Sequence, residues 1–290
     1  MTDGDRRSTR PHSGEEPSPA LVPRVAVIGC GAIGSALIEA WPQFLQGRFE
    51  LASVLVRPDQ AESLALAHRT GARLVTSIEE LLATAPDIVV EAAGHQAIIV
   101  HGEQILSTGC ELILFSVGAL ADDDLRYRLK RSALLAKARI VIPTGALAGF
   151  DGLRCLRASG LQRVKYTCIK PVEAWRHTAA EEIVDLDSLE CSTSIFCGSA
   201  RDAARAYPRN ANLAAAVAFA GLGLDRTEVE LIADPAATEI HARIEAQSAT
   251  DELDVIMAGA GFSSNPKSSR ITAMSAIAAL YDRTQPVMFA

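Results

Sequence analysis

The sequence predicts an α/β protein with a doubly wound parallel sheet, followed by a second domain of α+β class. Short β-branched runs alternate strictly with helical segments from Val22 to about Pro143, the pattern of a parallel sheet with helices on both faces. A glycine-rich turn directly follows the first of these strands. After Pro143 the alternation gives way to strand-rich sequence, and 290 residues are enough for two domains.

The first domain is expected to span residues 21–145. Gly71 and Gly109 follow two of its expected helices, at positions where glycine commonly ends a helix. The hydrophobic periodicity predicts strands at 24–29, 50–56, 87–94, 111–118 and 139–143, and helices at 35–45, 61–70, 77–85, 95–109 and 121–138.

The second domain, of α+β class, is expected to span residues 146–264. Many strands with few helices favour an antiparallel sheet covered on one face. Segment 265–290 returns to helical composition, with Pro266 near its start, and is expected to pack back on the first domain as a C-terminal helix. Strands are expected at 164–170, 192–198, 228–234, 239–246 and 253–259, with one strong helix at 199–223.

Composition excludes several classes of protein. A net charge of -7 with no basic run argues against a nucleic-acid partner. No stretch approaches about 18 consecutive apolar residues, and residues 1–20 lack the apolar core of a signal peptide and are expected to form a disordered leader. The six cysteines are scattered without C-x-x-C pairs, so no metal site is expected. Reduced thiols indicate a cytoplasmic protein without a membrane partner.

A glycine-rich turn joins the first expected strand to the first expected helix. It places Gly29, Gly31 and Gly34 in G-x-G-x-x-G spacing, with Ile33 before the last glycine. Such a turn is tight, lets the backbone approach a pyrophosphate, and aims a helix N-terminus at the phosphates. The motif alone is weak, but the surrounding strand, helix and alternation supply its context. These four residues are predicted to bind a dinucleotide in a Rossmann-type domain; the alternative is a turn that binds nothing.

Arg57 follows the second expected strand. An acidic residue near this position would bind the ribose 2′-hydroxyl of NAD, whereas an arginine can pair with the 2′-phosphate of NADP. Asp59 lies two residues further on, so NAD is not excluded. The cofactor is therefore predicted to be NAD or NADP, and the alternative for Arg57 is a solvated surface residue.

Several motifs together resemble the L-aspartate dehydrogenase family, and they cover nearly everything after Pro23. The resemblance implies NAD(P)-dependent oxidative deamination of L-aspartate to iminoaspartate, which yields oxaloacetate and ammonia or feeds NAD biosynthesis. It also implies a homodimer formed through the second, substrate-binding domain. The motifs are GCGAIG, VEAAGHQAI, SVGAL, PTGALAGFDGL, KPVEAW, the segment from FCGSARDAARAYPRNANLAAA to VELIADP, and NPKSSRITAMS.

The resemblance also implies roles for individual residues. The catalytic histidine of the family falls on His241 in EIHARIE, and the nicotinamide-side contacts fall on Ala146 and Asn212. Asn210 lies in the same motif as Asn212 and is the alternative to it. The stretch before His241 reads TEI where an asparagine-containing run would be expected, so the sequence departs from the family there.

The chemistry of the reaction agrees with a histidine. Removing a hydride from the α-carbon requires a neutral amine, so a base that titrates near neutral pH is useful. His95, after the strand 87–94, and His177 are the other candidates outside helix interiors and the leader. Aspartate carries two carboxylates, so cations must meet them. Lys170 in KPVEAW is the predicted substrate-binding residue, with Lys267 in NPKSS as a second candidate.

Two rival functions remain open from the sequence. A related two-domain reductase, of the homoserine dehydrogenase or dihydrodipicolinate reductase type, would share the fold. A dinucleotide-sensing regulator without turnover would share the cofactor domain, since fold does not fix function. Such a regulator would need a basic DNA-binding module or a partner surface, and the acidic sequence shows neither.

Overall fold

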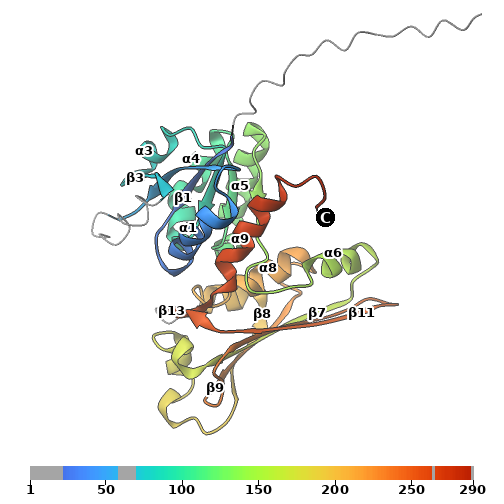
Figure 1. Ribbon diagram of the computed structural model, residues 1–290. Coiled ribbons are helices and arrows are strands. Elements are labelled where there is room, and N and C mark those ends of the chain that lie inside the picture. The colour runs from blue at the N-terminus through green and yellow to red at the C-terminus, as the bar shows by residue number, and fades with distance from the viewer. Residues whose placement is uncertain (1–21, 58–69, 263–264, 289–290) are drawn as a thin grey trace, which may run out of the picture.

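The computed structural model describes residues 22–57, 70–262 and 265–288. Figure 1 shows two stacked parts: a sheet with helices on both sides, and below it a second sheet whose helices lie on one side. The predicted fold class, a Rossmann-type parallel sheet followed by an α+β domain, is confirmed. The expected leader and most of the expected helix 61–70 lie outside the described residues.

The first sheet has six strands in the order β3-β2-β1-β4-β5-β6, and all neighbours are parallel. From β1 the chain first builds the sheet outward through β2 and β3, and then continues on the other side of β1 with β4, β5 and β6. In doubly wound α/β sheets, ligands bind in the crevice at this point, at the carboxyl ends of the strands. The strands are β1 Arg24–Ile28, β2 Glu50–Leu55, β3 Arg73–Val75, β4 Ile88–Glu91, β5 Glu111–Leu114 and β6 Ile140–Val141. The helices are α1 Ala32–Phe44, α3 Ile78–Leu82, α4 His95–Ser107, the 3-10 turn η1 Val117–Ala121, and α5 Asp123–Ala136.

Most expected elements of this domain are confirmed, with one addition. Strand β3 was not expected, because three residues are too few to show a periodicity. Gly109 follows α4 with φ +87°, which confirms it as the residue that ends this helix.

The second sheet has five strands in the order β11-β10-β7-β9-β8. The expectation of a purely antiparallel sheet is wrong at one pair, because β9 runs parallel to β7. The long segment between these strands contains β8 and two helices, which is enough chain for a parallel crossover. The strands are β7 Arg163–Pro171, β8 Thr193–Ser199, β9 Glu228–Asp234, β10 Ile240–Gln247 and β11 Glu252–Gly259. The helical segments are α6 Phe150–Ala158, η2 Val172–Trp175, η3 Ala179–Glu182, η4 Leu186–Ser188, α7 Ala200–Ala206 and α8 Asn212–Ala220.

The expected helix 199–223 is two helices. Helix α7 ends before Pro208 and α8 begins after it, because a proline disfavours helical conformation in the residue before it. The break matters for function, since the residues between the two helices line the cavity described below.

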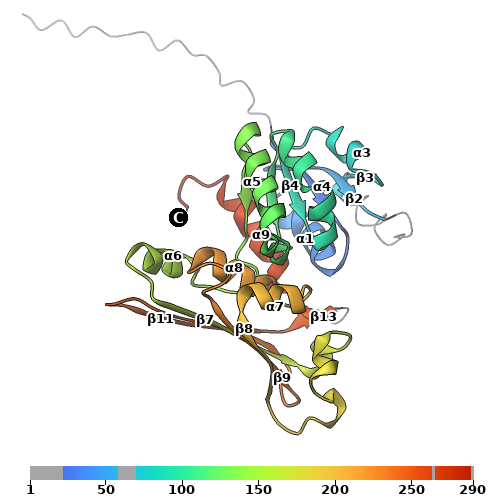
Figure 2. The same cartoon turned by 180° about the vertical axis from the view of Figure 1, so that it is seen from behind.

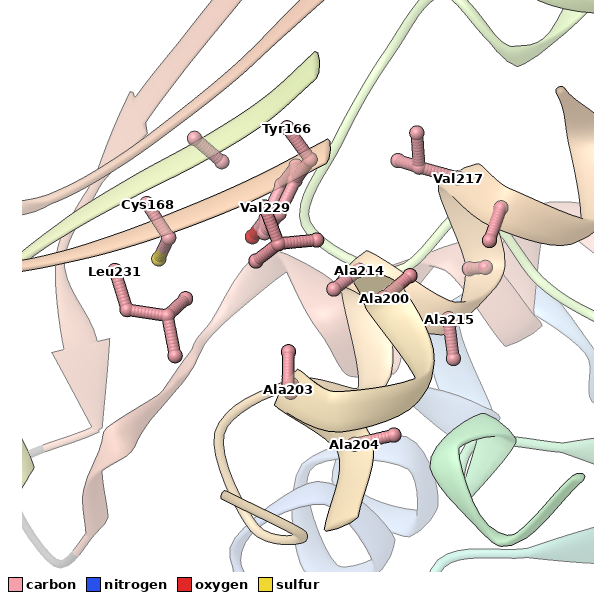
Figure 3. Close-up of a cluster of buried hydrophobic side chains, with 14 of the residues drawn as sticks. Tyr166, Cys168, Ala200, Ala203, Ala204, Ala214, Ala215, Val217, Val229 and Leu231 are labelled. Atoms are coloured by element: carbon pink, nitrogen blue, oxygen red, sulfur yellow. The ribbon is translucent and has the colours of Figure 1, made fainter. Parts of the chain in front are cut away.

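The core of the second domain lies between the sheet and these two helices. Figure 3 shows Tyr166, Cys168, Val229 and Leu231 from the strands facing an alanine-rich helical surface that includes Ala203. Small side chains allow the helices to approach the sheet closely. The helices lie on the side of this sheet that faces the first domain, and Figure 2 shows the same arrangement from behind. Among the described residues of this domain, the α-helices α6, α7 and α8 all lie on that one side, and none of them covers the opposite face of the sheet.

The C-terminal segment returns to the first domain. The short strands β12 Gly261–Phe262 and β13 Asn265–Ser269 pair with each other, and helix α9 Ile271–Asp282 follows. The expectation of a helix starting near Pro266 is therefore wrong for its first turn, which is strand. Helix α9 packs beside α1, where Ala273, Ala276 and Leu280 join the cluster that contains Trp41.

Arg201 in α7 ties the two domains together at one side. Its guanidinium donates to the carbonyl of Ala121 (2.6 Å) and to the carboxylate of Asp123 (2.9 Å) in the first domain. It also holds Asp225 through two hydrogen bonds of 2.6 and 2.8 Å. Hydrogen bonds from this arginine lower the pKa of both carboxyl groups, so the contact is fully formed at neutral pH.

Candidate active site

A cavity of about 1170 Å³ lies between the two domains. It opens at the carboxyl ends of the parallel strands, where the order of the first sheet predicts a ligand. The first domain contributes the glycine-rich turn, the end of β2 and the loops after β4 and β5. The second contributes β7, η2 and the residues around the start of α8. The lining residues that enter the argument are Gly31, Ile33, Arg57, His95, Ala146, Tyr166, Cys168, Lys170, Asn210, Asn212 and Ile240.

The three glycines of the turn are required for different reasons. A Cβ on Gly34 would lie 2.1 Å from the carbonyl oxygen of Gly29, and one on Gly29, whose φ is +95°, would lie 2.9 Å from the Ala92 oxygen. A Cβ on Gly31 would meet no atom within 4 Å. Gly29 and Gly34 are therefore needed for close packing of the protein backbone within the turn, whereas Gly31 and Ile33 line the cavity. The open space at Gly31 is what the close approach of a pyrophosphate needs.

The N-terminus of α1 faces this turn without a capping side chain. Gly31 is the N-cap residue and provides none. The first N–H groups of a helix have no partner inside the helix, and together with the helix dipole they favour an anion. Arg57 lies just past the end of β2, exposed and on the cavity wall. Asp59, which could serve NAD, lies outside the described residues.

A buried carboxylate organises the loops after β4 and β5. Glu91 is fully buried and accepts hydrogen bonds from the N–H groups of Ala93 (2.8 Å), Gly94 (2.7 Å) and Ser116 (3.0 Å). The Ser116 hydroxyl adds a fourth bond at 2.9 Å. Burial raises the pKa of Glu91, and the four hydrogen bonds act against that effect. Sequence analysis missed this role; the signal was a carboxylate at the end of a fully buried strand.

His95 and Asn212 meet across the domain boundary. The Nε2 of His95, the first residue of α4, lies 3.0 Å from Oδ1 of Asn212, the first residue of α8. The same oxygen accepts the N–H of Gly118 at 2.9 Å. A side chain on Gly118 would be crowded, since its Cβ would lie 2.8 Å from the His95 ring. Both side chains line the cavity and are partly exposed.

The second domain presents polar groups from one face of β7. Tyr166, Cys168 and Lys170 alternate along the strand and share the cavity face. Lys170 is 4% exposed, and its ammonium lies 5.4 Å from the centre of the Trp175 ring. Burial is the main cause that raises the pKa of Tyr166, so its phenol stays neutral. Ala146, at the boundary between the domains, is buried and also on the wall.

His241 does not join these residues. It lies on β10, where Ile240 and Ala242 point into the protein and the side chain of His241 is exposed. Successive side chains of a strand point to opposite faces, so His241 faces the open side of the sheet and does not line the cavity. The histidines on the cavity wall are His95 and His177.

The two asparagines of the motif NANLAAA separate. Asn210 is buried on the wall, and its side-chain amide donates to the carbonyl of Ala174 at 3.3 Å. Asn212 faces the first domain through its contact with His95. Lys267, the second lysine candidate, has its side chain outside the described part of the structure.

Within the described ranges, no group of three His, Cys, Asp or Glu side chains could hold a metal ion. In the same ranges no helix combines the length and apolar character that crossing a membrane requires. All six cysteines are free thiols.

Two family models match the chain. One described as "Aspartate dehydrogenase, C-terminal" matches residues 151–283, and one described as "Homoserine dehydrogenase, NAD binding domain" matches residues 29–143. The division between the two matches falls close to the start of α6, at the boundary between the two sheets.

Proteins named L-aspartate dehydrogenase are similar over almost the whole chain. One from Cupriavidus necator is 40% identical over 264 residues, which are 91% of this chain and 98% of the relative. One from Pseudomonas aeruginosa is 39% identical over 259 residues, 88% and 96% of the two chains.

Solved structures share the architecture. Aspartate dehydrogenase from Thermotoga maritima matches with a TM-score of 0.72 at 24% identity, covering 92% of this chain and 99% of that one. A homoserine dehydrogenase from Thiobacillus denitrificans matches with a TM-score of 0.59 at 15% identity, covering 90% and 72%. At these identities the matches concern the fold alone.

Proposed function

The chain belongs to the L-aspartate dehydrogenase family, and from that premise we propose that the interdomain cavity is the place where it oxidises L-aspartate with NAD or NADP. The protein is an NAD(P)-dependent amino-acid oxidoreductase, and iminoaspartate, then oxaloacetate and ammonia, are its products. The observation that carries the proposal is that one cavity joins the glycine-rich turn to a buried lysine of the second domain.

The residues on the cavity wall fit a nicotinamide dinucleotide. The open space at Gly31 and the uncapped N-terminus of α1 suit the pyrophosphate. Ala146 and Asn212 are proposed to contact the nicotinamide side. When bound, the cofactor supplies a hydride acceptor for the α-carbon of the substrate.

Lys170 is proposed to bind a carboxylate of L-aspartate. It is almost fully buried and lines the cavity on the side of the second domain. A buried ammonium can offer a charge-assisted hydrogen bond in a site with little water, which suits a substrate with two negative groups.

The function is tested by an amino-acid panel. We expect the purified protein to reduce NAD⁺ or NADP⁺ with L-aspartate and not with L-homoserine. Because the family of the chain is established, the homoserine dehydrogenase type and the regulator without turnover are not favoured. Equal or faster turnover of L-homoserine would contradict the assignment, and absence of any turnover across the panel would favour a regulator.

Arg57→Asp is expected to weaken NADP⁺ more than NAD⁺. The variant replaces a cation at the end of β2 with an anion that repels the 2′-phosphate. We expect the binding free energy of NADP⁺ relative to NAD⁺ to become less favourable by about 1 to 3 kcal/mol, the usual size for the loss of a charge-assisted contact. The measurement is KM for each cofactor at saturating L-aspartate. An unchanged KM for NADP⁺ would show that Arg57 is a bystander.

The role that the family resemblance implies for His241 stays a prediction. In a single chain its side chain is exposed on the open face of the second sheet. Comparing turnover of His241→Ala with wild type tests the role, and a loss of about 10²- to 10⁴-fold is the size expected for a general acid or base.

A homodimer is proposed through that same open face. None of the α-helices that the structure describes covers this face, and Ile256 on β11 is 60% exposed on it. Exposed apolar groups on one sheet face favour a second copy, and two-fold pairs are the commonest oligomers. The molar mass in solution, by light scattering, should be twice that of the chain, and Ile256→Asp should lower it. A wild-type monomer would end this proposal.

A cytoplasmic location is proposed as well. Six free thiols are typical of proteins kept under reducing conditions. Cell fractionation tests it, and recovery outside the cytoplasm would contradict it.

A further inference from the structure

We propose that the segment between helices α7 and α8 holds the α-amino acid end of L-aspartate. In this arrangement Oδ1 of Asn210 accepts a hydrogen bond from the substrate ammonium, and the guanidinium of Arg209 pairs with the α-carboxylate. Lys170 then binds the side-chain carboxylate. The proposal rests on the proposed function of the cavity, and it assigns one protein group to each charged group of the substrate.

The two polar atoms of the Asn210 amide differ in their surroundings. Nδ2 donates to the carbonyl oxygen of Ala174 at 3.3 Å, and because that oxygen can only accept, the contact fixes the orientation of the amide. Oδ1 is buried, and among the residues that the structure describes it has no hydrogen-bond partner. Buried polar atoms are nearly always hydrogen-bonded. Since Asn210 lines the cavity, a ligand in the cavity can supply the missing donor.

Of the charged groups of L-aspartate, the ammonium is the one that fits Oδ1. A carboxylate has only acceptor atoms and would be repelled by this oxygen, whereas an ammonium carries a positive charge and three N–H donors. A hydrogen bond from a charged donor is roughly twice as strong as one from a neutral donor. Asn210 is 6% exposed, so little water competes for its oxygen. Asn210 is therefore suited to recognise the amino group.

Arg209 supplies a cation directly beside this amide. It precedes Asn210 in the chain and lies on the same cavity wall, and in the described part of the chain no carboxylate pairs with it. Arg176 also lines the cavity, but its guanidinium already binds Glu173 at 2.9 Å and Asp187 at 2.6 Å. A guanidinium matches the two oxygens of a carboxylate. Because the ammonium and the α-carboxylate share one carbon, two adjacent residues can bind both.

The segment between α7 and α8 is packed against the strand that carries Lys170. Strand β7 runs directly into η2, which contains Ala174 and Trp175. The Trp175 ring lies between the Lys170 ammonium, 5.4 Å from its centre, and the ring of Tyr207, whose centre is 5.8 Å away. The hydrogen bond from Asn210 to Ala174 is a second link between the segment and η2. The groups that bind the substrate therefore belong to one packed unit of the second domain.

Three ligands that each lack one charged group of L-aspartate test the assignment. Succinate lacks the ammonium, β-alanine lacks the α-carboxylate, and L-alanine lacks the side-chain carboxylate. Calorimetry gives the affinity of all four ligands, with NADPH present at saturation so that no ligand is oxidised. We expect each incomplete ligand to bind wild type more weakly than L-aspartate by about 10- to 100-fold, the usual effect of losing a hydrogen bond to a charged group.

Each variant should lose one of these three preferences and keep the other two. L-aspartate should bind about as well as succinate to Asn210→Leu, as β-alanine to Arg209→Met, and as L-alanine to Lys170→Met. Damage to packing would weaken all four ligands together, so the ratio of two affinities separates recognition from structure. Asn210→Asp retains an acceptor and should keep the preference for L-aspartate over succinate. Arg205→Met is the control, because Arg205 is exposed on α7 and does not line the cavity, and it should keep all three preferences.

The outcomes distinguish this proposal from the proposed function. A preference for L-aspartate over succinate that persists in Asn210→Leu, or over β-alanine in Arg209→Met, would overturn the assignment even if wild type oxidises L-aspartate. An equal loss of affinity for all four ligands would overturn it as well, because the residue would then act only through packing. If the ratios change as expected but L-aspartate is not oxidised, the proposed function fails and the recognition of the amino acid stands.

Discussion

Gly34→Ala is expected to abolish dinucleotide binding and to lower the melting temperature of the protein. The new Cβ would lie 2.1 Å from the carbonyl oxygen of Gly29, and a backbone atom cannot move aside as a flexible side chain can. Overpacking of this kind costs about 1 to 3 kcal/mol or more, which for a chain of this size lowers the melting temperature by roughly 2 to 12 °C. Calorimetry and NADPH titration measure the two effects.

Gly31→Ala is the matched control. Its Cβ would meet no protein atom within 4 Å, so the melting temperature without cofactor should equal that of wild type. NADPH affinity should still fall, by about 10-fold or more, because the methyl occupies the space through which a pyrophosphate approaches the backbone. If both variants bind NADPH like wild type, the turn does not hold the cofactor. If Gly31→Ala is as unstable as Gly34→Ala, the distinction between packing and ligand approach is wrong.

The region around the glycine-rich turn is the part of the fold that the sequence predicts best. The strand, the glycine spacing and the following helix are local patterns, so β1, the turn and α1 could be placed from them within a few residues. The parallel pairing of β7 with β9 could not, because strand order depends on contacts between segments about 60 residues apart. A proline within a segment of helical composition can end a helix, and at Pro208 it does: α7 ends at Ala206 and α8 begins at Asn212.

The site divides in the same way. Gly31, Ile33, Arg57, Ala146, Lys170 and Asn212 all line one cavity, although they come from both domains. His241 does not line the cavity. Successive side chains of a strand point to opposite faces of the sheet, and a match to a family motif does not show which face a residue is on. The contact of His95 with Asn212 could not be predicted from the sequence. The two residues are 117 positions apart, and no local sequence pattern indicates that they meet.

Lys170→Met is expected to lower kcat/KM for L-aspartate by about 10²- to 10³-fold, mostly through KM. Removing one partner of a buried charge pair costs about 2 to 5 kcal/mol, because the other charge is left without a counterpart. Methionine keeps much of the length of the side chain, so packing beside Trp175 should survive. NADPH affinity should not change, since Lys170 belongs to the second domain and the glycine-rich turn to the first.

Lys165→Met is the control for this variant, because it makes the same substitution on the same strand. Lys165 lies on the opposite side of the sheet, where its ammonium binds Glu230 at 2.7 Å, so its loss should leave KM for L-aspartate within a few-fold of wild type. A monocarboxylate such as L-alanine gives a second control: the difference in kcat/KM between L-aspartate and L-alanine should shrink in Lys170→Met and not in Lys165→Met. Equal loss for both amino acids would mean that Lys170 does not recognise the side-chain carboxylate and acts on the α-carboxylate that they share. An unchanged KM for L-aspartate would remove Lys170 from the binding site altogether.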